Sequence, residues 1–197
     1  MRSDRKIRLL LIAFVAAALD GCGTSATPRF YSLNSAATPN GAPSVQTAVM
    51  VEAVSVPPAV DQPQIVVQVA PNRVEVEEFN RWDAPLGDSI ARAVAGDLSV
   101  LLATPNVATA PLANFIPAYT VTINVQRFES VKGEAALVDA LWVVRSAGGN
   151  TRSGHTIARE APQGEDFQAL AAAHSRAITK LSEDIAAAIR NDSAAKT

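Results

Sequence analysis

Short stretches in which apolar residues alternate with polar ones recur along the chain and predict β-strands. The clearest covers 119–126, where Val121, Ile123 and Val125 alternate with Thr and Asn, as in a strand with one buried face. After Val125 the alternation changes phase at Arg127-Phe128, which indicates a β-bulge. The other predicted strands are 29–33, 45–56, 65–69, 74–78, 135–145 and 151–160.

Two longer stretches repeat apolar residues at three- and four-residue steps and predict amphipathic helices. The first helix covers 83–103, with Asp83 as its cap and Pro85 in its first turn. The second covers 165–190 and begins with two acidic residues, which suit the positive end of the helix dipole. We expect residues 191–197 to form a frayed tail.

The order of these elements predicts an α+β fold, an α/β sandwich formed by one domain over 29–190. The most economical packing is a mostly antiparallel sheet with the two helices on one face. Strands 65–69 and 74–78 are predicted to form a hairpin. Within it we expect Val74 and Val76 to point inward and the intervening glutamates to point outward.

Residues 1–21 have the pattern of a secretion signal. Four basic residues precede an apolar run of 11 residues over 9–19. A membrane-spanning helix needs about 20 apolar residues, so this run is too short to span a bilayer. The pattern therefore predicts a signal peptide rather than part of the fold.

The signal ends in Leu19-Asp20-Gly21-Cys22, which resembles a bacterial lipobox, although Asp20 departs from its usual small or apolar residue. Cys22 is the only cysteine, so it has no intramolecular disulfide partner. We expect acylation of Cys22, with 22–28 as the lipidated residue and its flexible tether. Gly23 follows the cysteine, where enteric-type sorting rules place Asp for inner-membrane retention, so we expect the outer membrane.

Composition and charge narrow the possible partners. Apolar residues make up 48% of the chain and charged residues 18%, which favours a packed core over disorder. The net charge is −2, from 17 basic and 19 acidic residues. Residues 1–21 contain four basic and two acidic residues, so the remaining chain has 13 basic and 17 acidic residues, a net charge of −4. This balance does not favour nucleic-acid binding.

No group of residues in the sequence points to catalysis, a metal or a cofactor. Motifs typical of nucleophilic hydrolases, zinc proteases, P-loops and dinucleotide-binding folds are missing. His174 lies on the apolar stripe of the second helix and is predicted to be a buried structural residue, whereas His155 is predicted to be solvated. Trp82 and Trp142 are predicted to be core residues, with partner binding as the alternative.

Several short motifs occur in a characteristic order. They are Phe30-Tyr31-Ser32-Leu33, Val56-Pro57 leading to Asp61-Gln62-Pro63-Gln64-Ile65-Val66, Arg81-Trp82, Pro85-Leu86, Arg127-Phe128 and Ala140-Leu141-Trp142. With these motifs and the last helix, residues 22–190 resemble the ABC-type transport auxiliary lipoprotein family. Its members include the membrane-integrity lipoproteins of MCE-type (mammalian-cell-entry) lipid transporters, such as the paraquat-inducible lipoprotein subunit. Pro58-Ala59-Val60 departs from the aromatic residue and Leu that members often carry.

The resemblance implies a non-catalytic periplasmic subunit, held in the outer membrane by its lipid anchor. Its implied partner is the MCE-domain subunit of a lipid transporter, and several copies are expected to assemble into a ring. We expect Gln62, Gln64 and Gln68, along one edge of the predicted hairpin, to face a partner. Two alternatives remain open: a structural or assembly lipoprotein of another envelope complex, and a lipid-anchored hydrolase, for which no nucleophile–base pair is evident.

Replacing the predicted lipid-bearing residue tests the anchor. We expect Cys22→Ala to move the protein from the membrane to the soluble periplasmic fraction and to abolish its envelope function, because the acyl chains supply the attachment. Cell fractionation with immunoblotting measures the first effect. A variant that stays in the membrane fraction would contradict lipid anchoring, whereas an enzyme would keep its turnover after release.

Overall fold

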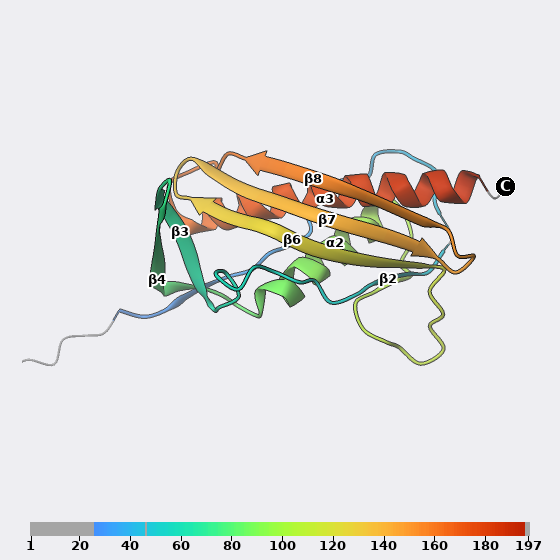
Figure 1. Cartoon of the computed structure of the whole chain (residues 1–197), viewed down its shortest axis with the longest axis horizontal. Coiled ribbons are helices and arrows are strands. Elements are labelled where there is room, and N and C mark those ends of the chain that lie inside the picture. The colour runs from blue at the N-terminus through green and yellow to red at the C-terminus, as the bar shows by residue number, and fades with distance from the viewer. Residues whose placement is uncertain (1–25, 46, 196–197) are drawn as a thin grey trace, which may run out of the picture.

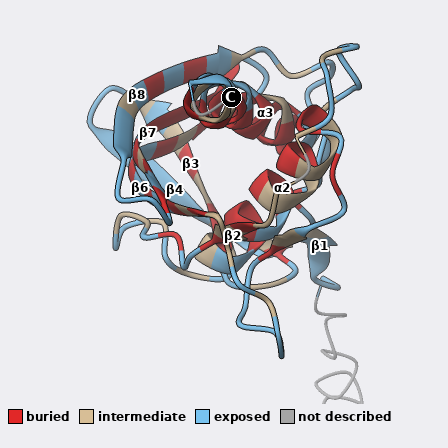
Figure 2. Ribbon diagram, turned by 90° about the vertical axis from the view of Figure 1, so that its right-hand side faces the viewer, coloured by how far each residue is buried: buried red, intermediate tan, exposed pale blue. Residues whose placement is uncertain are grey.

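The computed structural model describes residues 26–45 and 47–195, and the predicted signal peptide and Cys22 lie outside these ranges (Figure 1). In the described chain, eight strands form one sheet with the order β1-β4-β3-β6-β2-β5, and β7 and β8 extend from β6. The strands are β1 (Arg29–Tyr31), β2 (Val49–Val51), β3 (Gln64–Ala70), β4 (Arg73–Trp82), β5 (Val107–Ala108), β6 (Tyr119–Val131), β7 (Ala135–Ser146) and β8 (Thr151–Glu160). Helices α2 (Leu86–Leu101) and α3 (Phe167–Ala194) lie on the same side of the sheet (Figure 2).

The core lies between this helical layer and the inner face of the sheet. Alternate residues of β7 from Ala136 to Val144 are buried there, together with the apolar stripe of α3 from Phe167 to Ile189. β7 pairs with both β6 and β8, so it lies inside the sheet and not at its edge. The predicted two-helix α+β fold is therefore confirmed.

The bulge in β6 is confirmed as well. The register of β6 against β7 shifts between Val125 and Arg127. Before the shift the odd-numbered residues point inward, and after it Phe128 and Ser130 are the buried ones. The bulge therefore turns Phe128 into the core and Arg127 to the solvent.

The prediction of a mostly antiparallel sheet is wrong, because the sheet is mixed. Four of the seven strand pairs in the described chain are parallel: β1–β4, β2–β5, β2–β6 and β3–β6. These pairs are short, and three of them involve the peripheral strands β1, β2 and β5. The long pairs β3–β4, β6–β7 and β7–β8 are antiparallel. Strands this short have too few residues for the alternation to indicate whether they pair in parallel or antiparallel.

The predicted orientation of the hairpin valines is also wrong. Val66 lies opposite Val76 and Val67 lies opposite Glu75, so Val76 shares a face with Val66 and not with the buried Val67. Val74 is 59% exposed and Val76 is 53% exposed. The hairpin strands were predicted correctly, but alternation alone does not say which of their faces meets the core.

β3 is not an edge strand, because β4 and β6 flank it. The line through Gln62, Gln64 and Gln68 is therefore not an edge of the sheet. The predicted strand 45–56 is reduced to β2, followed by a single parallel bridge between Ser55 and Asn124.

The helix ends differ from the predictions in two places. α2 begins at Leu86 after Pro85, and Asp83 accepts a hydrogen bond from Ser32 Oγ at 2.6 Å instead of capping the helix. α3 is capped by Asp166, as its acidic start suggested, and it continues to Ala194. The expected fraying from 191 onward is thus wrong for 191–194, where Asp192 is buried.

Asp97 of α2 is a fully buried carboxylate that joins three parts of the fold. Its donors are Ser35 Oγ at 2.7 Å, the backbone N–H groups of Ala36 and Ala37 at 3.0 Å, and Ser182 Oγ of α3 at 3.0 Å. A Cβ at the neighbouring Gly96 would lie 2.9 Å from Ser35 Cβ, so glycine permits this close approach. Asp97 therefore fixes the N-terminal segment against both helices.

Removing the Asp97 carboxylate leaves several donors without an acceptor in the core. We expect Asp97→Ala to lower the free energy of unfolding by about 3 kcal/mol. The exposed Asp88 on the same helix is the matched control. Asp88→Ala should change the free energy of unfolding by less than about 0.5 kcal/mol. Urea unfolding followed by circular dichroism measures both effects. Equal stability of Asp97→Ala and the wild type would contradict the assigned role.

Candidate docking surface

His174 occupies a closed aromatic cluster in the core. Its ring stacks on Phe128 with centroids 4.0 Å apart and meets the edge of Trp82 at 6.0 Å. Nε2 lies 2.8 Å from Ser130 Oγ, and Nδ1 has no hydrogen-bond partner among the described residues. Burial lowers the pKa of His174 to about 3. His174 is therefore neutral, its predicted burial is confirmed, and Trp82 is confirmed as a core residue.

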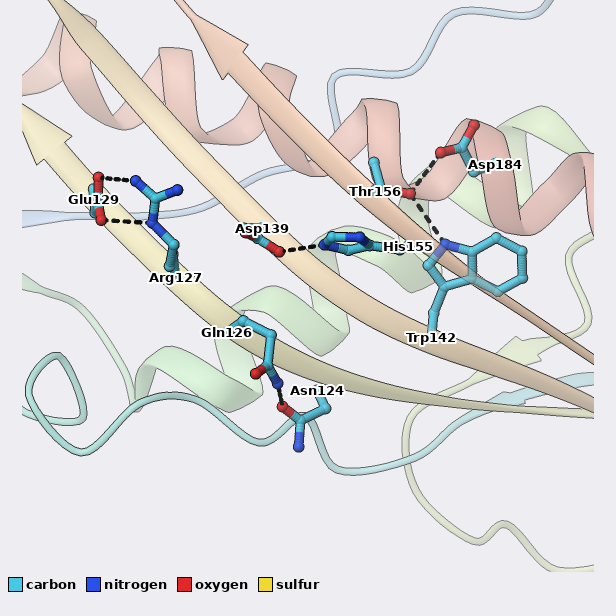
Figure 3. Close-up of polar contacts among 9 residues, drawn as sticks. All are labelled: Asn124, Gln126, Arg127, Glu129, Asp139, Trp142, His155, Thr156 and Asp184. Carbon is cyan, nitrogen blue, oxygen red and sulfur yellow. Dashed lines mark hydrogen bonds and ion pairs between the residues drawn. The ribbon is translucent and has the colours of Figure 1, made fainter.

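Trp142 also belongs to the core, where it connects the sheet to α3. Its Nε1–H donates to Thr156 Oγ1 at 3.0 Å, and that hydroxyl donates to Asp184 of α3 at 2.5 Å (Figure 3). The indole covers Gly154 on β8, where a Cβ would come within 2.2 Å of the ring. The tryptophan is thus fully explained by packing and one hydrogen-bond chain.

The remaining histidine lies on the opposite face of the sheet. His155 Nε2 is 2.7 Å from Asp139 Oδ1, and the His155 side chain is half-exposed (Figure 3). No group of three His, Cys, Asp or Glu residues in the described chain is placed to hold a metal ion. Within the same residues, no helix has both the length and the apolar character to cross a bilayer. The pair alone lacks a nucleophile and an oxyanion site, so it does not form a recognisable catalytic centre.

The outer face of the sheet, turned away from the helices, is the most distinctive described surface. Leu141 of β7 is 46% exposed and Ile157 of β8 is 61% exposed. By the alternation of β7 and β8, both residues share this face with the Asp139–His155 pair. Arg127 and Glu129 of β6 lie on it too, with Arg127 Nε 2.8 Å from Glu129 Oε1 (Figure 3). The hydrogen bonds and the ion pair to Glu129 raise the pKa of Arg127, so it remains charged.

A groove of about 300 Å³ continues this face at the β3–β4 hairpin. Val66 and Val74 of the hairpin line one side of the groove, and Val60 lines it from the preceding loop. Arg127 and Glu129 form the side next to β6. An apolar surface bordered by charged pairs is the usual composition of a protein-binding surface. We define the outer face as these groove residues together with Leu141, Ile157 and the Asp139–His155 pair.

The predicted partner-facing glutamines have different positions relative to the outer face. Gln68 lines the groove, and its side chain donates to the Pro71 carbonyl at 3.3 Å. Gln64 lies on the same side of β3 as Gln68, because side chains alternate between the two faces along a strand. Gln62 lies in the loop before β3 and donates to the Ala59 carbonyl at 3.3 Å. Partner contact by these residues remains a prediction.

Sequence reasoning missed both Asp97 and the exposed apolar residues of the outer face. Asp97 lies three residues after Val94 and four before Leu101, on the buried stripe of α2, and that spacing was the available signal. Leu141 lies in a strand whose two faces are both apolar in sequence, and the sequence does not show that nothing covers the face of Leu141. Its exposure depends on both helices packing on the other side.

The sequence comparison identifies one family. Residues 31–186 match the model described as ABC-type transport auxiliary lipoprotein component. Among curated proteins, none matches the sequence at a significant level.

Two crystal structures have a similar fold. A Xanthomonas campestris protein of the DUF330 family has a TM-score of 0.70 at 22% identity, and the match covers 86% of this chain and 99% of that one. An uncharacterized protein has a TM-score of 0.69 at 20% identity, with 83% and 99% covered. At these identities the likeness concerns the fold alone.

The low pKa of His174 predicts that acid destabilises the fold. An unfolded histidine binds a proton below about pH 6.5, whereas the buried one does not until about pH 3. The free energy of unfolding is therefore highest above about pH 6.5, where neither state binds this proton. It decreases as the pH falls, by about 2 kcal/mol between pH 7 and pH 5. Replacing the ring by His174→Phe should remove this part of the slope. Urea unfolding of both proteins at each pH measures it, and identical slopes would contradict the assignment.

Proposed function

The chain belongs to the family of ABC-type transport auxiliary lipoprotein components, and from this premise we propose that it is a non-catalytic subunit of an MCE-type lipid transport system. In this proposal, acylated Cys22 holds the domain at the periplasmic face of the outer membrane. The partner is the MCE-domain subunit, whose tunnel carries lipid between the membranes. The observation that carries the proposal is the family match over residues 31–186.

The outer face supports a docking role rather than a chemical one. Its exposed side chains, Leu141 and Ile157, contribute binding energy only when a partner covers them. The Asp139–His155 and Arg127–Glu129 pairs are already formed within the domain. They can therefore orient a partner at the rim of an interface without rearranging.

The lipid anchor raises the local concentration of the domain near the transporter and is not itself part of the binding surface. A domain tethered to one membrane meets a transporter that reaches the same membrane at a high effective concentration. A modest interface is then sufficient for stable attachment. In the same proposal, several copies surround the end of the tunnel as a ring and form a collar at the membrane.

Mild crosslinking in cells followed by affinity capture of the lipoprotein tests the partnership. Mass spectrometry should recover an MCE-domain subunit with the wild type. The double variant Leu141→Lys/Ile157→Lys should lower this recovery at least about tenfold, because it places two charges in the centre of the apolar surface. Both side chains are exposed, so the melting temperature should stay close to that of the wild type.

The matched control adds the same two charges on the helical side. Ala172 and Ala187 are exposed on α3, and Ala172→Lys/Ala187→Lys should recover the MCE subunit as the wild type does. If the wild type repeatedly fails to capture an MCE subunit, the proposed partner is wrong. Equal loss in both double variants would instead remove the outer face as the docking site.

A further inference from the structure

The loop that joins β5 to β6, residues 109–118, has an unusual composition for an exposed segment. No charged residue occurs between Asp97 and Arg127 in the sequence. Within the loop, Leu112 is 60% exposed and Ile116 is 85% exposed. Long connections without regular structure are commonly functional, and this one displays large apolar side chains to solvent.

The loop is held in shape by its own backbone. Its C-terminal end is attached just before β2, where the N–H groups of Ala118 and Tyr119 donate to the Ala48 carbonyl at 2.9 and 3.1 Å. At the tip, the Phe115 N–H donates to the Leu112 carbonyl at 3.1 Å, which closes a turn. Asn114 has a φ of 63°, the left-handed conformation that Asn tolerates in turns. The tip therefore presents its apolar side chains from a defined turn.

The loop and the start of the described chain project from the same side of the molecule. In Figure 1 the yellow-green loop is the lowest part of the domain, and β1 lies in its lower half at the other end of the long axis. Figure 2, turned about the vertical axis, shows both again on the lower side. A flat surface along that side therefore meets the loop and the N-terminal segment together.

The tether restricts the distance between that surface and the domain. Six residues lie between Cys22 and Arg29, and the seven residue steps from one to the other span at most about 25 Å when extended. Once Cys22 is acylated, β1 must stay within this distance of the bilayer. This limit is compatible with an orientation in which the lower side of the domain, including the loop, lies against the lipid.

We infer that the 109–118 loop inserts Leu112 and Ile116 into the surface of the membrane that carries the Cys22 anchor. This inference rests on the proposed function, which supplies the anchor. Lipid is the occupant that fits an uncharged loop, because inserting a charged side chain would cost far more than inserting an apolar one. The groove at the base of the loop is lined by Leu112 and by Arg92 of α2, whose guanidinium suits anionic headgroups. The outer face, with its Arg127–Glu129 ion pair, lacks this uncharged character.

A fluorescent probe on the loop tests the inference. The acylated full-length lipoprotein carrying Ile116→Cys is labelled with an environment-sensitive fluorophore and reconstituted into vesicles of phosphatidylethanolamine and phosphatidylglycerol. Acylation occupies Cys22, the only native cysteine, so the label is specific. The matched control is Ile157→Cys on the outer face, which is also exposed and apolar. A lipid-borne quencher should quench the probe at 116 at least about threefold more strongly than the probe at 157.

The outcomes separate the inference from the function on which it rests. Strong quenching at 116 with weak quenching at 157 supports insertion. If the protein floats with the vesicles but the probe at 116 is quenched no more than the control, the loop inference is overturned while the anchor stands. Shielding at 116 that requires added transporter subunit would overturn it as well, in favour of a protein contact. If the protein does not float with the vesicles, the anchor itself fails and the inference fails with it.

Discussion

The buried carboxylate of Asp97 is the group on which the arrangement of the domain depends. It accepts four hydrogen bonds, from the N-terminal segment and from α3, while it belongs to α2. A charge in the core is tolerated only when such donors surround it. By satisfying them, Asp97 holds both helices and the incoming chain together on the inner side of the sheet.

This arrangement leaves two surfaces with different chemistry. The outer face of the sheet combines exposed Leu141 and Ile157 with the Arg127–Glu129 ion pair and the Asp139–His155 pair, and the 109–118 loop presents apolar residues without any charge. The first composition suits a protein partner and the second suits lipid. In Figure 2 the outer face of β6–β8 and the loop point in different directions. In our proposal, one domain therefore contacts its membrane and a transporter partner at the same time.

Much of the fold could be predicted because it depends on local pattern. Alternation located the long strands and the bulge at Arg127, and the three- and four-residue steps located both helices. The face on which Val74 and Val76 lie could not be predicted, because it depends on the register with β3. The parallel pairing of β1, β2 and β5 depends on contacts distant in sequence. Asp97 was missed for a related reason, since its donors lie about 60 and 85 residues away.

In our proposal, the outer face binds an MCE-domain transporter subunit while the anchor holds the domain at the membrane. Photo-crosslinking in living cells tests it most directly, with a benzophenone amino acid at Leu141 and, for comparison, at Ala172 on the exposed side of α3. We expect a crosslink to an MCE-domain subunit from position 141 and none from position 172. A crosslink from 172 alone, or no MCE-domain subunit captured from 141 while the lipoprotein stays in its membrane, would contradict it.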